Sequence, residues 1–490
     1  MRGFVSAFLF CLVPALCLSQ AESQGTAPAP QSEPLRLVQT IRLPDTITGN
    51  FDHFGIDLKR SRLFATPEDF KAVLVFDINT GKLLRQISGI ARPHAILYRP
   101  DLDHLYVTDG VDGSIKVYDG ETYQLVDRIA LLKDADSIGY DISRRYLYVD
   151  NGGGDVGQSY SMLSVVDTTA RKKIADIKID GNTLEAMALD QFRPRMYVND
   201  KAKNQVVVVD RLKNTIAATW PLTMGRVNVA MALDEQRQRL FVGCRSGEIV
   251  VFDTNTGKEL QALPITKGVD DLIYDPGTRR IYAAGDGVVD VFGQTDLDHY
   301  TSLGSMRTGP GGKTARLSPE LNRLFVAVPK GASERAHIMV FEPTNIPAPK
   351  DPVDEPKASV NAPIAESIVL ETLSRHPALR KLGLHVMPPG QENMVIVANG
   401  NATRIGVRTT DRDFAAVKDG KTYCARIEDG AFYNLKMPMF DAQGRHIGIL
   451  VMEIPYTSAA DEPDAIRQAE NIRKELEQEI PSLESLFRPA

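Results

Sequence analysis

The chain has 490 residues, so a typical size of about 150 residues per domain predicts more than one domain and fewer than four. Hydrophobic residues make up 43% of it and charged residues 24%, a composition that excludes wholesale disorder. The 57 Lys and Arg residues against 63 Asp and Glu residues give a net charge of −6. This balance argues against a nucleic-acid-binding protein driven by bulk positive charge.

The N-terminal segment predicts export. Arg2 supplies the positive charge typical of the beginning of a signal peptide, and the apolar stretch Phe4–Leu18 is followed by small residues of the kind that precede a signal-peptidase cleavage site. A transmembrane anchor needs about 20 apolar residues, and Pro14 interrupts a stretch that is already shorter. We therefore expect residues 1–21 to be a signal peptide and residues 22–34 to be disordered. The mature chain is expected in the periplasm or outside the cell, without a membrane span.

Cysteine usage excludes several kinds of site. Removal of the signal peptide leaves Cys244 and Cys424, which are too few for a disulfide-stapled scaffold. No CxxC pair is present for structural zinc, thioredoxin-like chemistry or c-type haem. We expect both cysteines to be small apolar side chains of the core.

A repeat of about 44 residues runs through most of the chain. In each unit a dipeptide such as Leu-Phe or Leu-Tyr opens one strand, and another apolar strand follows after a polar loop. The dipeptides begin at Leu63, Leu105, Leu147, Met196, Leu240, Ile281 and Leu324. Four short strands per unit at this period are typical of a propeller blade. We therefore predict an all-β seven-bladed β-propeller over residues 35–343, followed by a small α+β domain.

The last unit stops after its third strand, at Glu342. Residues 35–43, LRLVQTIRL, precede the first unit and match the pattern of a fourth strand. Pairing of this segment with the last blade would close the ring and cover two exposed sheet edges. We predict that residues 35–43 are the outer strand of the last blade.

Two segments, LYVTDGVDGSIKVYD at 105–119 and RLFVGCRSGEIVVFDTNTGK at 239–258, resemble the YVTN-repeat propellers of the YncE-like family. The resemblance covers residues 35–343 and implies a propeller fold. It leaves function open, because related propellers include exported binding proteins, lactonases and an antibiotic lyase. Trp220 is the only tryptophan, unlike WD-repeat blades and the blades of quinone-dependent dehydrogenases.

Counting back eleven residues from each dipeptide finds an equivalent position near the start of every innermost strand. Strands that begin at one height around a sevenfold axis bring these side chains to the mouth of the central channel. The positions hold Asp52, His94, Asp136, Glu185, Val229, Asp270 and Lys313. Asn228 precedes the one apolar member, and we include it instead of Val229 in the predicted ligand or ion site.

Two interpretations of this ring stay open. Carboxylate oxygens are the ligands that Ca²⁺ prefers, and a bound ion would also activate a carbonyl group or a water molecule. The carboxylates that would hold a metal are Asp52, Asp136, Glu185 and Asp270. Alternatively, polar side chains line a wet channel only to satisfy trapped water. No HExxH or GxSxG motif is present, and no catalytic residue is assigned.

The proline-rich residues 344–363 predict an extended linker. Residues 364–490 then suit one small α+β domain, with helical spacing over 364–382 that Pro377 breaks or kinks and a closing helix around Ile472. Strand-like runs begin at Met394, Thr403, Lys421, Ala431 and His446.

The segment 433–456, YNLKMPMFDAQGRHIGILVMEIPY, resembles the last hairpin of PAS and Cache sensor domains. The residues that match its Pro-x-x-Asp-x-x-Gly-x-x-Ile-Gly pattern are Pro438, Asp441, Gly444, Ile447 and Gly448. The resemblance implies a small ligand held against the sheet. Its candidate contacts are Tyr423, Arg426, Tyr433 and Lys436. A structural domain without any ligand is the alternative.

Together these features predict an exported, non-enzymatic binding, scaffold or sensor protein. The propeller would recognise a protein or a small-molecule ligand, and the PAS/Cache-like module would bind a small ligand. The alternative is a metal-assisted lactonase or lyase with its site at the channel mouth. No nucleic-acid partner is expected.

Overall fold

The computed structural model describes residues 33–488 except 101, 142–143, 192, 236, 297, 332–333, 345–356 and 428–431, together with Met1 and Gly3. The predicted signal peptide, nearly all of the predicted disordered segment and most of the predicted linker lie outside the described residues. Glu33–Ala490 forms one compact unit. Within the described residues, no helix combines the length and the apolar character needed to cross a membrane.

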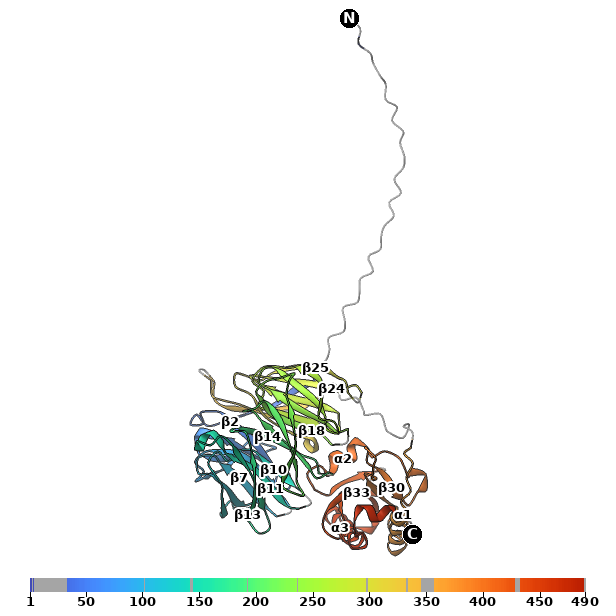
Figure 1. Cartoon of the computed structure of the whole chain (residues 1–490). Helices are drawn as coiled ribbons and strands as arrows, with labels where there is room; N and C mark the ends of the chain where they lie inside the picture. Colours follow the sequence, from blue (N-terminus) through green and yellow to red (C-terminus); the bar gives the residue numbers. More distant parts are fainter. Residues whose placement is uncertain are drawn as a thin grey trace. The chain divides into compact units, whose positions relative to one another are not determined.

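Seven four-stranded antiparallel sheets form a propeller, and each sheet is one blade (Figure 1). The first blade contains β2 (Phe51–Asp57), β3 (Arg62–Pro67), β4 (Ala72–Asp77) and β5 (Leu83–Ser88), and the second contains β6 (Pro93–Arg99), β7 (His104–Asp109), β8 (Ser114–Asp119) and β9 (Leu125–Ala130). The third blade contains β10 (Ile138–Asp141), β11 (Tyr146–Gly152), β12 (Ser161–Asp167) and β13 (Lys172–Ile179), and the fourth contains β14 (Leu184–Leu189), β15 (Arg195–Asp200), β16 (Gln205–Asp210) and β17 (Thr215–Pro221).

The fifth blade contains β18 (Asn228–Asp234), β19 (Arg239–Cys244), β20 (Glu248–Asp253) and β21 (Lys258–Pro264). The sixth contains β22 (Asp271–Asp275), β23 (Arg280–Gly285), β24 (Val288–Gln294) and β25 (Tyr300–Arg307). The seventh contains β26 (Thr314–Ser318), β27 (Arg323–Val328), β28 (His337–Pro343) and, from the other end of the propeller sequence, β1 (Leu35–Arg42). The first strands of neighbouring blades contact one another in a closed ring, so these seven strands surround the central channel.

The acidic residue at the end of the third strand closes a turn in five blades. One carboxylate oxygen of Asp77 accepts the backbone N–H groups of Asn79 and Thr80 at 3.1 and 2.8 Å. The same pair of bonds, to the residues two and three positions on, recurs at Asp119, Asp167, Asp210 and Asp253. The repeated Asp therefore has a local structural role, because it satisfies backbone donors where the chain reverses.

The predicted closure is confirmed by the pairing of β1 with β28. The register runs antiparallel from Leu35 opposite Pro343 to Arg42 opposite His337. Leu35 and Ile41 are buried, and each belongs to a different apolar cluster between blades. The N-terminal strand is therefore part of the core as well as the cover of a sheet edge.

The C-terminal residues form a five-stranded antiparallel sheet with helices, which confirms the α+β class (Figure 1). In space its strands follow the order β30 (Val395–Asn399), β29 (Lys381–Val386), β33 (His446–Pro455), β32 (Phe432–Phe440), β31 (Tyr423–Ile427). The helices α1 (Pro363–Arg375) and α3 (Glu462–Glu479) share one apolar cluster with one face of the sheet. The helix α2 (Asp411–Val417) packs on the opposite face, where Phe414 and Val417 contact Ile449 and Val451.

The expected break at Pro377 is confirmed, because the first helix ends at Arg375, and a residue that precedes proline is disfavoured in a helix. Two other expectations for this domain are wrong. Leu382, which was expected in the helical segment, lies in β29. The expected strand at Thr403 is a 3₁₀ turn, Ala402–Arg404, followed by Gly406 at a positive φ of 82°. The helix α2 was not expected from the sequence, although Thr410 and Asp413 form a capping box at its start.

Hydrogen bonds join the C-terminal domain to the end of the propeller where the innermost strands finish. Both oxygens of Asp411 are held, at 2.8 Å by Arg237 and at 2.5 Å by Arg279. Arg99 donates to the carbonyl oxygen of Asp419 at 3.1 Å. The side chain of Asp411 is 3% exposed, so this ion pair is shielded from water.

Candidate functional site

A cavity of about 520 Å³ opens where the innermost strands begin, at the mouth of the central channel. It is lined by every position found by counting along the repeat: Asp52, His94, Asp136, Glu185, Val229, Asp270 and Lys313. The repeat places equivalent residues at one height, so the sequence located this group of side chains without knowledge of the fold.

Asn228 does not line this cavity, which corrects its predicted place in the ring. Its side chain is buried and donates to Asn199 Oδ1 at 2.9 Å and to the carbonyl oxygen of Gln205 at 3.0 Å. Successive side chains of a strand point to opposite faces, so Val229 faces the channel and Asn228 faces the blade.

Asp52 joins two imidazoles at one side of the cavity. One carboxylate oxygen lies 2.6 Å from His53 Nδ1, and the other contacts His94 Nδ1. Burial lowers the pKa values of both imidazoles, but the acids outweigh it. Asp52 raises the pKa of His53 to about 10, and the hydrogen bond to Asp52 with the charge of Asp136 raises the pKa of His94 to about 9. Burial raises the pKa of Asp52, but the two imidazoles hold it well below its usual range. Both histidines are therefore cationic in the absence of a bound ion.

Asp136 is the third member of this group, and its Oδ1 lies 3.7 Å from His94 Nδ1. Burial and the charge of Asp52 raise the pKa of Asp136 to about 7. Ligand atoms of Asp52, His94 and Asp136 all lie within 4.8 Å of one another, close enough to share one metal ion. This group contains two of the four carboxylates expected at a metal, together with an imidazole.

The other two expected carboxylates are paired with cations. Glu185 contacts Lys201, and Asp270 contacts both Arg245 and, at 2.9 Å, Lys313. The ring is therefore divided into an acid and imidazole group on the first three blades and a group of ion pairs on the last four. The ion pairs offset the negative charge that Glu185 and Asp270 would offer to a metal.

The cavity also contains functional groups that the sequence analysis missed, among them His53, Asp271, Glu68, Lys201 and Arg245. His53 and Asp271 each follow a ring position directly. The other three stand five residues after the dipeptide of their unit, at the end of the second strand. The same count along the repeat would have found them.

The pKa of Asp271 predicts that the free energy of unfolding changes with pH. Its carboxylate accepts the backbone N–H of Ala315 at 2.7 Å, and His53, Asp270 and Asp52 are its charged neighbours. Burial raises the pKa of Asp271 to about 7, although His53 and the bond from Ala315 oppose the change. The folded protein thus holds this proton more tightly than the unfolded chain, so ionisation of Asp271 costs stability as pH rises from about 4 to about 7.

We expect Asp271→Asn to be more stable than the parent above pH 7 and to match it near pH 4, because the amide resembles the protonated carboxyl and still accepts from Ala315. Urea unfolding at both pH values measures the difference. An equal difference at pH 4 and pH 8 would contradict the raised pKa.

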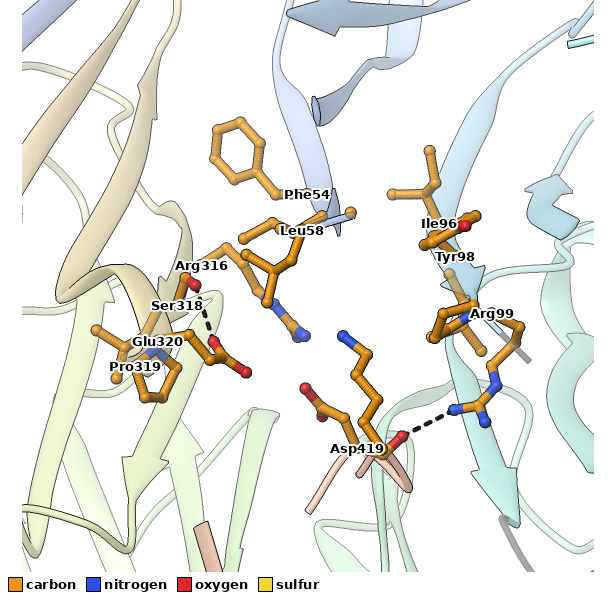
Figure 2. A pocket seen from close by; sticks show the side chains of 16 residues that line it. Phe54, Leu58, Ile96, Tyr98, Arg99, Arg316, Ser318, Pro319, Glu320 and Asp419 are labelled. Atoms are coloured by element: carbon orange, nitrogen blue, oxygen red, sulfur yellow. Dashed lines mark hydrogen bonds between the residues drawn. The ribbon is translucent and has the colours of Figure 1, made fainter. Parts of the chain in front are cut away.

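The opposite end of the channel holds a smaller cavity of about 90 Å³, shown in Figure 2. It is lined by Leu58 and Arg316 of the propeller and by Asp419 of the C-terminal domain, and Arg316 also lines the cavity at the mouth. Ligand pockets commonly measure about 300 Å³ or more, so this space suits water better than a ligand.

The four ligand candidates of the C-terminal domain do not converge on one face. Tyr423 lies opposite Lys436, and Arg426 lies opposite Tyr433, in the pairing of β31 with β32. Lys436 contacts Asp413 of α2 at 2.7 Å, whereas Tyr433 lies in the cluster with α1 and α3. Since the two pairs occupy opposite faces of the sheet, they cannot hold one small ligand together.

The hairpin residues of the sensor-domain resemblance have structural roles. Asp441 accepts the backbone N–H groups of Gln443 and Arg445 at 3.0 and 2.9 Å, and Gly444 has a positive φ of 75° in the same turn. A Cβ atom at Gly448 would overlap the carbonyl oxygen of His385 on β29. The motif is thus explained by the turn and by close strand packing.

Comparisons with known proteins support the propeller and little beyond it. No family model matches this chain. Over 99 residues the chain is 30% identical to the uncharacterized protein YncE of Salmonella typhi, a match that spans 20% of this chain and 28% of that protein. A chain in the crystal structure of the mitotic checkpoint complex matches with a TM-score of 0.53 at 14% identity, over 67% of this chain and 98% of that chain. The first is a distant sequence likeness, and the second shows the fold alone.

Proposed function

We propose that this chain is an exported, non-enzymatic binding protein that takes a small ionic ligand at the mouth of the propeller channel. The observation that carries the proposal is the single cavity of about 520 Å³ in which residues from all seven innermost strands meet. Its volume lies within the range of small-molecule pockets, about 300–1,000 Å³.

The charges of the cavity indicate the kind of ligand. Asp52 and Asp136 lie on one side with two imidazoles, and Arg245 and Lys313 share a single carboxylate, that of Asp270, on the other. A ligand with charged or strongly polar groups is favoured over an apolar one, because burial of these side chains beneath an apolar surface would leave them without compensation.

Export and a sensory role remain part of the proposal. The N-terminal residues, which resemble a signal peptide, support export. The likeness to YncE supports assignment of residues 35–343 to the YVTN-repeat propellers, and the hairpin at 433–456 supports a PAS/Cache-like sensor module. In this proposal the propeller binds the ligand and the C-terminal domain, joined to it through Asp411, forms a platform for a partner.

The binding function predicts a ligand-dependent thermal shift. We expect one class from a panel of amino acids, dicarboxylates and polyamines at millimolar concentration to raise the Tm of the parent, because a ligand that binds only the folded state stabilises it by about 2.7 kcal/mol at a hundred times its Kd. Asp136→Asn or Arg245→Gln should reduce the shift, since each removes a charge from the cavity.

The matched control is Arg128→Gln, which removes a cation from an exposed ion pair with Asp112 on the outside of the second blade. This variant should keep the full shift. Ligand stabilisation that is unchanged in both cavity variants would show that the ligand binds elsewhere and would contradict the proposal.

A metal-assisted lactonase or lyase is the second candidate, and the proximity of Asp52, His94 and Asp136 favours it. A bound ion there could polarise a substrate carbonyl or activate water. Metal analysis of protein purified without chelator, followed by a lactone-hydrolysis panel, separates the candidates. Metal-dependent turnover that Asp136→Asn abolishes would establish the enzyme, and the absence of both metal and turnover would remove it.

A further inference from the structure

We propose that Asp52, His94 and Asp136 bind one divalent transition-metal ion, of the class that includes Mn²⁺, Co²⁺ and Zn²⁺, at the edge of the cavity. The inference deepens the proposed binding function and rests on the same site, since it names an ion that would hold part of the ligand. Three neighbouring blades supply the three ligands, one from each of the first, second and third.

The spacing of the ligand atoms suits one ion. Metal bonds to imidazole nitrogen and carboxylate oxygen are about 2.0–2.2 Å long, so two atoms on one ion lie about 3–4.4 Å apart. His94 Nδ1 and Asp136 Oδ1 are separated by 3.7 Å, and the whole set lies within 4.8 Å. Without an ion, the proton on His94 Nδ1 joins it to Asp52. When an ion binds, this proton passes to water and the contact opens to the spacing that the metal requires.

The position of the His94 ring is built into the second blade. The ring is buried, and its Nε2 edge packs against Gly110, where an added Cβ atom would lie 2.6 Å from Nε2. Gly110 is not among the glycines with positive φ, so its backbone conformation does not require glycine. The missing side chain instead makes room for the imidazole, which leaves Nδ1 facing Asp52 and Asp136. At the equivalent positions of the fourth and fifth blades stand the long side chains of Lys201 and Arg245.

A buried acid, Asp150, lies beside the group and has one side-chain oxygen without a donor in the part of the chain that the structure describes. Asp150 is 3% exposed, and its Oδ1 has no hydrogen-bond donor among the described residues. The backbone of Asp136 donates to the carbonyl oxygen of Asp150 at 3.1 Å, so the two acids are neighbours in the third blade. Buried carboxylate oxygens without a donor are rare in proteins. Burial and the charge of Asp136 raise the pKa of Asp150, and a divalent ion at Asp136 would favour the ionised form of both acids.

The ligand set favours a transition metal over calcium. Calcium takes about six to eight oxygen ligands, whereas imidazole nitrogen suits the first-row metals. Of the four carboxylates expected at a metal, the other two, Glu185 and Asp270, are paired with Lys201, Arg245 and Lys313 and so are poorly placed to complete a calcium shell. Three protein ligands leave coordination positions open toward the cavity, where an oxygen of the bound ligand or water completes the shell.

The test is calorimetric titration of the chelator-treated full chain with Mn²⁺, Zn²⁺ and Ca²⁺, together with the visible absorption spectrum of the Co²⁺ form. We expect one equivalent of Mn²⁺ or Zn²⁺ to bind, with at least a tenfold loss of affinity in His94→Gln and in Asp136→Asn. Gly110→Ala keeps all three ligands and displaces the His94 ring, so it should weaken binding and change the Co²⁺ spectrum.

Asp155→Asn is the matched control, because Asp155 is an exposed acid of the same cavity and the substitution removes one negative charge without removing a ligand. Its affinity should stay within about twofold of the parent. Thermal melts of every variant show whether it is folded. Metal affinity that is unchanged in folded His94→Gln and Asp136→Asn, or equal affinity for Ca²⁺, overturns the inference.

The outcome also separates this inference from the proposed function. If no metal binds, but a compound of the panel stabilises the parent and not Arg245→Gln, the proposed metal site is wrong and the proposed small-ligand binding function stands. If metal binds as expected and no compound gives a shift, the metal site stands and the small-ligand function fails.

Discussion

Truncation of two buried side chains on β1, in the double variant Leu35→Ala/Ile41→Ala, is expected to lower the free energy of unfolding by about 4–10 kcal/mol. A buried Leu or Ile replaced by Ala costs about 2–5 kcal/mol, and the two residues lie far enough apart along the strand, about 20 Å, for their effects to add. Leu35 packs in the cluster of the sixth and seventh blades, and Ile41 packs in the cluster of the seventh and first. Urea unfolding followed by circular dichroism measures the loss.

The same strand offers the matched control. Leu37 and Val38 are exposed by 46% and 38%, so Leu37→Ala/Val38→Ala should cost less than about 1 kcal/mol. Deletion of residues 35–42 should have a larger effect than either double variant, because it also leaves β28 as an open edge and promotes aggregation. A deletion variant that unfolds at the urea concentration of the parent would contradict the closed ring.

Loss of the ion pair at Asp411 is the second large effect. In Asp411→Ala the side chain of Arg237, 4% exposed, keeps Asp234, at 3.5 Å, as its ion-pair partner among the residues that the structure describes. Removal of one partner of a buried pair costs about 3–5 kcal/mol, and the remaining carboxylate places the expected loss near the lower limit. We also expect that proteolysis between Pro343 and Pro363 leaves two pieces that elute together in the parent and separately in Asp411→Ala.

Glu479→Ala is the control for this variant. Its ion pair with Arg375 has a similar distance, 2.7 Å, but both side chains are more than a third exposed. Exposed pairs contribute about 1 kcal/mol or less, so this substitution should change stability little. Replacement of both buried partners, in Arg237→Met/Asp411→Leu, should recover only part of the loss, because Arg279 also loses Asp411 and the buried Asp234 also loses Arg237. Equal losses in Asp411→Ala and Glu479→Ala would show that burial of the pair is unimportant.

The C-terminal domain shows where local patterns were ambiguous. The strand β29 follows Pro377 by only a few residues, and its apolar side chains also fit the helical spacing read across 364–382. The hydrophobic run at Thr403 has the alternation of a strand, yet Gly406 turns the chain before a sheet partner is reached. A short apolar run fits either a helix or a strand until its packing partners are known.

Repetition explains why so much of the propeller could be predicted. Each unit repeats the dipeptide, the turn-forming Asp and the innermost strand, so the blade count, the closure by β1 and the height of Asp52, Asp136 and Glu185 around the channel follow from the sequence alone. These features depend on short-range rules of strand alternation and turn chemistry, which a sequence displays directly.

Only the tertiary structure decided which charges in the channel mouth neutralise one another. The pairs Asp270–Arg245 and Glu185–Lys201, and the contact of Asp52 with His94, join residues 16 to 42 positions apart that lie in or next to different strands. The tertiary structure also decided that the side chain of Asn228 faces the interior of its blade. It placed the four C-terminal ligand candidates on two opposite faces of the C-terminal sheet. Ion pairing depends on distances of a few ångströms and on burial, both of which are set by how neighbouring strands and blades pack rather than by the order of residues in the chain.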